Sequence, residues 1–68
     1  MPTITYEISF YNRHGELDSH HQITDSDSAW YTFRCFAEEE SAEAYSRITL
    51  TKYDWTDFSE NLLATLTF

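Results

Sequence analysis

Hydrophobic and polar residues alternate strictly along the first part of the chain. Over residues 3–11 every second side chain is apolar or aromatic, and the residues between are mostly polar. This alternation is typical of a β-strand that buries one face. Residues 12–15 (NRHG) then predict a tight hairpin turn. Residues 16–23 predict a weaker second strand, with Leu17 and Ile23 toward the core. The core-facing residues of the first strand are Ile4, Tyr6, Ile8 and Phe10.

The spacing of apolar residues then changes to that of a helix. Residues 24–28 (TDSDS) resemble a helix start, because Thr24 and Asp27 take the positions of a capping box and acids are favourable in a first turn. We predict a helix from about residue 26 to about residue 39, with its aromatic residues packed on the sheet. The apolar residues at helical spacing are Ala29, Trp30, Phe33, Phe36 and Ala37.

Alternation returns in residues 44–54 and again in residues 62–68. The element order is therefore ββαββ, and the strand order 2-1-3-4 makes every neighbouring pair antiparallel. We predict an α+β fold, in which residues 1–68 form one small domain with a four-stranded antiparallel sheet and one helix on one face. The other face would expose Thr and Tyr side chains, which suit exposed strands on propensity alone. Part of that face is also a candidate dimer surface, formed by Tyr11, Tyr45, Tyr53 and Leu63.

The charge of the chain narrows the class of partner. Twelve acidic residues against four Lys and Arg give a net charge of −8. Such a chain is repelled by phosphate backbones and anionic membranes, so direct binding to nucleic acid or membrane is not expected. The competing explanation for the net negative charge is that the acidic residues only keep the protein soluble. The single cysteine and the lack of a leader pattern in the first ten residues favour a reducing, cytoplasmic location.

The predicted topology gathers acidic and aromatic residues at one end of the sheet. The helix start and the turn between the last two strands both lie there, and together they form the candidate partner-binding site. The alternative is that Trp55 and Phe58 fold back to close the end of the core. A secondary acidic patch, Glu38, Glu39, Glu40 and Glu43, is expected at the other end. The candidate site comprises Asp25, Asp27, Asp54, Trp55, Asp57, Phe58 and Glu60.

Motifs for catalysis or for a cofactor are weak in this sequence. His20 and His21 are adjacent in a predicted strand, so their side chains point to opposite faces and do not favour a shared metal. Cys35 lies among aromatic residues of the predicted helix, which favours an inert thiol over a nucleophile. We therefore predict no catalytic residue, no metal site and no cofactor, and a protein that is not an enzyme.

Two functions remain. The first is a small acidic protein-binding module that inhibits a partner with a basic or nucleic-acid-binding surface by presenting carboxylates in place of phosphates. Phage or plasmid accessory proteins that block host defence, and immunity proteins that neutralise basic toxins, share this size and charge. The second is a structural or regulatory protein that forms a homodimer through its Thr/Tyr sheet face or a strand edge.

Overall fold

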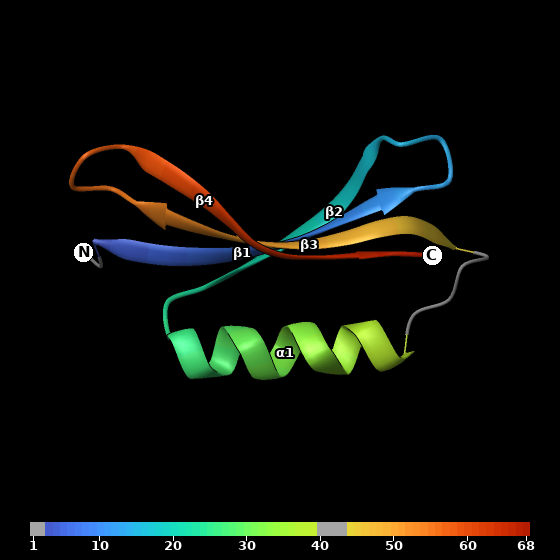
Figure 1. The fold of residues 1–68 in the computed structure, drawn as a ribbon, viewed down its shortest axis with the longest axis horizontal. Coiled ribbons are helices and arrows are strands. Elements are labelled where there is room, and N and C mark those ends of the chain that lie inside the picture. Colours follow the sequence, from blue (N-terminus) through green and yellow to red (C-terminus); the bar gives the residue numbers. More distant parts are fainter. Residues whose placement is uncertain (1–2, 40–43) are drawn as a thin grey trace.

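The computed structural model describes residues 3–39 and 44–68, and its fold is the predicted α+β arrangement. Four strands form one antiparallel sheet in the order β2-β1-β3-β4, and one helix lies on one face (Figure 1). The elements are β1 (Ile4–Asn12), β2 (Leu17–Ile23), α1 (Ser26–Glu39), β3 (Tyr45–Asp54) and β4 (Ser59–Thr67).

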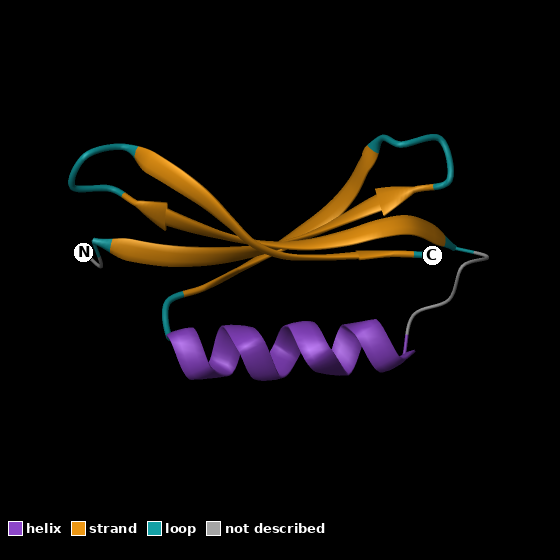
Figure 2. Cartoon of the chain, in the orientation of Figure 1, coloured by secondary structure: helices purple, strands orange, loops and turns teal. Residues whose placement is uncertain are grey.

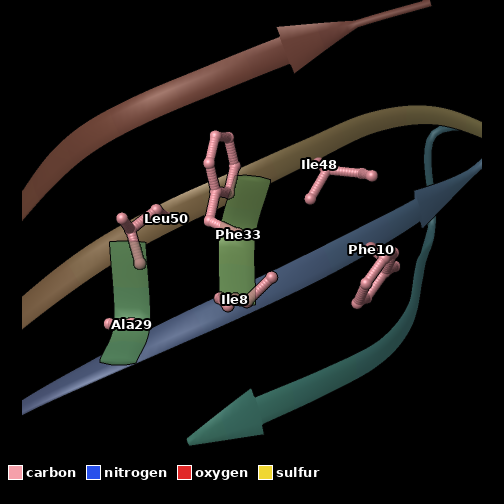
Figure 3. Packing of buried hydrophobic residues seen from close by; sticks show 6 residues of the cluster. All are labelled: Ile8, Phe10, Ala29, Phe33, Ile48 and Leu50. Atoms are coloured by element: carbon pink, nitrogen blue, oxygen red, sulfur yellow. The ribbon is translucent and has the colours of Figure 1, made fainter. Parts of the chain in front are cut away.

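The core lies between α1 and the two central strands, β1 and β3 (Figures 1 and 3). Burying one Ile, Leu or Phe side chain stabilises a fold by about 1.5–3 kcal/mol, so a few residues supply most of the hydrophobic stabilisation here. Trp30 was predicted to join them, but it is 38% exposed at the side of α1, with its ring edge against Phe33. The buried apolar residues are Ile8, Phe10, Ala29, Phe33, Ile48 and Leu50.

The helix begins as predicted, at Ser26, but with a different capping residue. The carboxylate Oδ2 of Asp25 accepts a 2.8 Å hydrogen bond from the backbone N–H of Ser28. The carbonyl of Asp25 accepts the first helical bond, from Ala29 N, at 2.9 Å. Asp25 is therefore the N-cap, in the position predicted for Thr24.

Three irregularities in strand pairing change which side chains face the helix. In β2, Phe10 pairs with Ser19 while Tyr11 pairs with Leu17, so one residue of β2 is unpaired. An extra residue of this kind moves the following side chains to the opposite face. Leu17, predicted to lie in the core, is consequently on the face away from α1 and is 54% exposed.

A second irregularity corrects the prediction for Tyr45. Tyr11 pairs with Arg47 and Asn12 pairs with Tyr45, which leaves Ser46 between them without a paired residue in β1. The Ser46 hydroxyl donates to the carbonyl of Asn12 at 2.7 Å. Tyr45 therefore packs against the core on the helix side, with its ring 5.1 Å from that of Phe10, and does not belong to the outer face.

The third irregularity lies in β4, where Leu50 pairs with Ala64 and Thr51 pairs with Leu62. Leu63 is the unpaired residue and is 37% exposed, while Leu62 lies on the face away from α1 and is 63% exposed. Leu62 thus takes the place on the outer face that was predicted for Leu63.

Both hairpins bend away from the helix, as Figures 1 and 2 show. Sheets twist with a fixed hand, and bulges increase the local bend. The sheet face opposite α1, called the open face below, is therefore concave.

Candidate functional site

The open face holds a shallow hollow of ≈ 440 Å³. It runs across all four strands, because side chains of the two central strands form its floor and the bent hairpins form its sides. This surface, called the open-face hollow below, is lined by Glu7, Ser9, Tyr11, Leu17, Arg47, Thr49, Thr51, Tyr53, Glu60 and Leu62.

Small polar residues form the floor of the hollow. Ser9 and Thr49 are cross-strand partners and are only 6% exposed each, although the helix lies on the other side of the sheet. Short side chains between taller neighbours leave room above them. The Ser9 hydroxyl also donates to Oε1 of Glu7 at 3.1 Å, which holds that carboxylate against the floor.

Trp55 extends the aromatic surface at one side of the hollow. Its indole N–H donates to Oγ1 of Thr5 at 2.8 Å, and Thr5 is buried. The indole stacks on the ring of Tyr53 with centroids 5.7 Å apart and planes 16° apart. Trp55 therefore folds back on the sheet, but on the open face, so the alternative that it closes the end of the core is wrong.

Tyr53 lies among acidic groups. Glu60 is its cross-strand partner on β4, and Glu7 lies on β1 two residues beyond its partner Thr5. Burial raises the pKa of the Tyr53 hydroxyl, and the negative charges of Glu7 and Glu60 raise it further. The same carboxylates that disfavour a tyrosinate would favour a cation at this position.

Arg47 occupies the opposite side of the hollow. Its guanidinium carbon is 4.1 Å from the centroid of the Tyr11 ring, which is a cation–π contact. The two residues are cross-strand partners, and Glu7 faces Thr51 instead. Arg47 is therefore not the cross-strand partner of Glu7.

The β3–β4 turn, residues 55–58, uses its acids to hold its own backbone. Oδ1 of Asp54 accepts from Thr56 N at 3.0 Å, and Oδ1 of Asp57 accepts from Ser59 N at 3.1 Å. Hydrogen bonds from the Ser59 hydroxyl and backbone N–H lower the pKa of Asp57. Asp two residues before a turn N–H is a known turn signal, so Asp54 and Asp57 have a local structural role in addition to the predicted binding role.

Phe58 is the last residue of this turn and is 83% exposed. Its φ of 57° lies in the left-handed region, which is rare for a residue with a large side chain. The alternative, that Phe58 folds back to close the end of the core, is therefore wrong. The turn instead presents a phenyl ring to solvent.

The predicted seven-residue site is divided between two places. The helix start, with Asp25 and Asp27, and the β3–β4 turn lie at the same end of the molecule, but the turn bends away from α1 (Figure 1). Asp54, Trp55, Asp57, Phe58 and Glu60 stay together around the turn.

The outer side of α1 has two depressions, of ≈ 700 Å³ and ≈ 250 Å³, so the first is larger and the second smaller than the open-face hollow. Asp27, Trp30, Tyr31 and Arg34 line one, and Tyr31, Arg34, Cys35 and Glu38 line the other. Of the predicted secondary acidic patch, Glu38 is exposed and Glu39 ends the helix. Glu40 and Glu43 lie outside the described residues.

Within residues 3–39 and 44–68, no three or more His, Cys, Asp or Glu side chains are placed to hold a metal ion together. In the same part of the chain, no helix has the length and apolar character that crossing a membrane requires. The fold is that of a small α+β protein with one covered and one open sheet face. Comparison with protein-family models, curated proteins and solved structures finds no match to this chain.

Proposed function

We propose that this chain is a small acidic protein-binding module that inhibits a partner with a basic, nucleic-acid-binding surface. Its carboxylates take the place of phosphates in the partner's cationic groove. The net charge of −8 supports the sign of the partner's surface, since oppositely charged surfaces associate faster and discriminate against wrong partners.

The observation that most supports the proposal is that Phe58 has a strained backbone conformation and an exposed ring. A large side chain with φ of 57° costs about 1–2 kcal/mol in backbone strain, and at 83% exposure its ring recovers little of that by burial. Strain that folding does not require is a feature of functional sites. Aromatic residues with few rotamers are also the side chains that dominate binding energy at protein interfaces. Asp57 precedes Phe58 and Glu60 follows it two residues later, so this part of the chain carries negative charge.

Capture from a lysate of the source organism tests the function. Immobilised protein should retain basic nucleic-acid-binding proteins at low salt, and heparin should release them at an ionic strength at which sodium chloride does not. Phe58→Gly should weaken capture, because it removes the ring and keeps the turn.

The matched control is Tyr31→Gly or Tyr31→Ala, which removes a comparably exposed ring (65%) from the far side of α1. Retention that heparin does not reverse, or that survives Phe58→Gly unchanged, would contradict the proposal.

Self-association is the second candidate, and it rests on a different observation. β4 is an edge strand whose residues Glu60, Asn61, Leu62 and Leu63 are all exposed. An uncovered edge is a template for pairing with another strand. A concentration-dependent shift in sedimentation that Leu63→Lys abolishes would support a homodimer; a monomer at all concentrations would exclude it.

A further inference from the structure

The open-face hollow combines aromatic rings and carboxylates in the way that protein sites for cations do. Tyr53 and Trp55 form a stacked pair at one side, and Glu60 pairs directly with Tyr53 across the strands. Cross-strand partners have Cβ atoms about 4.5–5.5 Å apart, and diagonal neighbours such as Glu7 and Tyr53 are about 7–8 Å apart. One planar cation on the Tyr53 ring is therefore within reach of both carboxylates.

The protein already places a guanidinium on this face. Arg47 lies over Tyr11 at 4.1 Å, on the opposite side of the same hollow. Lys52, the other basic residue of β3, alternates with Tyr53 and so lies on the helix side. The half of the hollow around Tyr53 thus has aromatic rings and negative charge. Lys52, the basic residue next to Tyr53 on β3, lies on the other face of the sheet and does not neutralise that charge.

We propose that the open-face hollow is a docking site for an arginine side chain of a basic protein partner. The guanidinium lies on the face of the Tyr53 ring opposite Trp55, and its N–H groups donate to the carboxylates of Glu7 and Glu60. This inference rests on the proposed function, because it names the residue by which such a partner is held.

Arginine fits this site better than lysine does. Its planar group stacks on an aromatic face and donates to two carboxylates at once, whereas an ammonium is a compact charge with a strong hydration shell. A second copy of this chain is a poor occupant of the hollow, because it has only four Lys and Arg residues to offer the carboxylates of Glu7 and Glu60.

Titration with a defined peptide tests the site without knowledge of the partner. A blocked tri-arginine peptide is added to the full chain, and backbone amide shifts are followed by NMR. We expect the shifts to centre on Glu7, Tyr53 and Glu60, and a tri-citrulline peptide, which has the same shape without the charge, to cause none.

Charge-matched variants separate this site from general attraction. Glu7→Gln with Glu60→Gln should weaken binding about tenfold, whereas Asp27→Asn with Glu38→Gln, which removes the same charge from α1, should change it by less than about twofold. Tyr53→Phe keeps the ring and should bind normally, while Tyr53→Thr should not. The amide spectrum of each variant verifies that it is folded.

Several outcomes overturn the inference. These are shifts centred on the β3–β4 turn or on α1, equal weakening by the two charge pairs, equal binding of tri-citrulline, or a dimer that covers this face. If the peptide fails at the hollow but heparin-sensitive capture depends on Phe58, the inference falls and the proposed function stands. If neither test succeeds, both the inference and the proposed function are wrong.

Discussion

Phe58 is a single residue whose backbone conformation costs stability without a matching gain from burial. Its backbone takes a conformation suited to glycine, and its ring lies in solvent. The local sequence gave no sign of this, because the strain arises from the geometry of a four-residue hairpin connection and not from the residue type.

Phe58→Gly should therefore raise the free energy of unfolding, by up to about 1 kcal/mol, because glycine adopts this φ without steric cost. Urea denaturation followed by tryptophan fluorescence measures the change. Phe58→Val, which is β-branched, should lower the stability instead. A Gly variant less stable than the original protein would mean that the phenyl ring contributes to folding.

Asp25 makes the stability that the helix cap contributes depend on pH. Its hydrogen bonds from Ser28 hold the folded-state pKa below the ordinary value of 3.8. A group with a lowered folded pKa stabilises the fold above its unfolded pKa, and that contribution disappears as the pH falls through the folded pKa. Asp25→Ala should therefore lower the Tm by a few degrees near neutral pH, and the difference should shrink in strong acid.

Asp25→Asn distinguishes the cap from its charge. Asparagine also caps a helix but does not titrate in this range. Its Tm should lie close to that of the original protein, with a difference that decreases between about pH 6 and about pH 2. A constant difference between aspartate and asparagine across that range would argue against a lowered pKa.

At the scale of elements, period and turn composition were enough to predict the five elements and their order. The antiparallel order 2-1-3-4 follows from strand directions once the helix is taken as a crossover. What alternation could not predict is the position of the unpaired residues. A strict period of two assigns Leu17 and Tyr45 to the wrong faces, because one extra residue in a strand reverses every side chain beyond it. The hollow was missed for the same reason, since its sides include Leu17 and Leu62.

Deletions in β4 test this account of the sheet. Removing Leu63 should leave a continuous ladder with Leu62 and Ala64 on their present faces, so the protein should remain folded with a modest loss of Tm. Removing Thr65 shifts Leu66 from its partner Ile48 and turns it to the open face. That deletion should cost more, roughly 1–3 kcal/mol, because the apolar contact of Leu66 with the core is lost. Equal costs for the two deletions, measured by urea denaturation, would show that Leu63 is not a surplus residue.

At the scale of the whole molecule, charge affects both stability and association. The described part of the chain measures 37 × 22 × 16 Å, and the net charge is −8. The Debye length is about 30 Å at 0.01 M salt and about 8 Å at 0.15 M, so repulsion acts across the molecule in the first case and only between neighbours in the second. Self-repulsion destabilises the compact state.

Adding sodium chloride over this range should therefore raise the Tm and, in the same samples, slow the association with a basic partner or with the tri-arginine peptide. Opposite responses of the Tm and of association to added salt are informative, because a general effect of salt on hydrophobic packing would strengthen both folding and association. Potassium chloride should act as sodium chloride does, since the cause is screening and not a bound ion. A Tm that falls with salt would mean that the carboxylates make favourable electrostatic interactions within the fold. The acidic residues would then contribute to folding stability, and their number would not have to be explained by a partner.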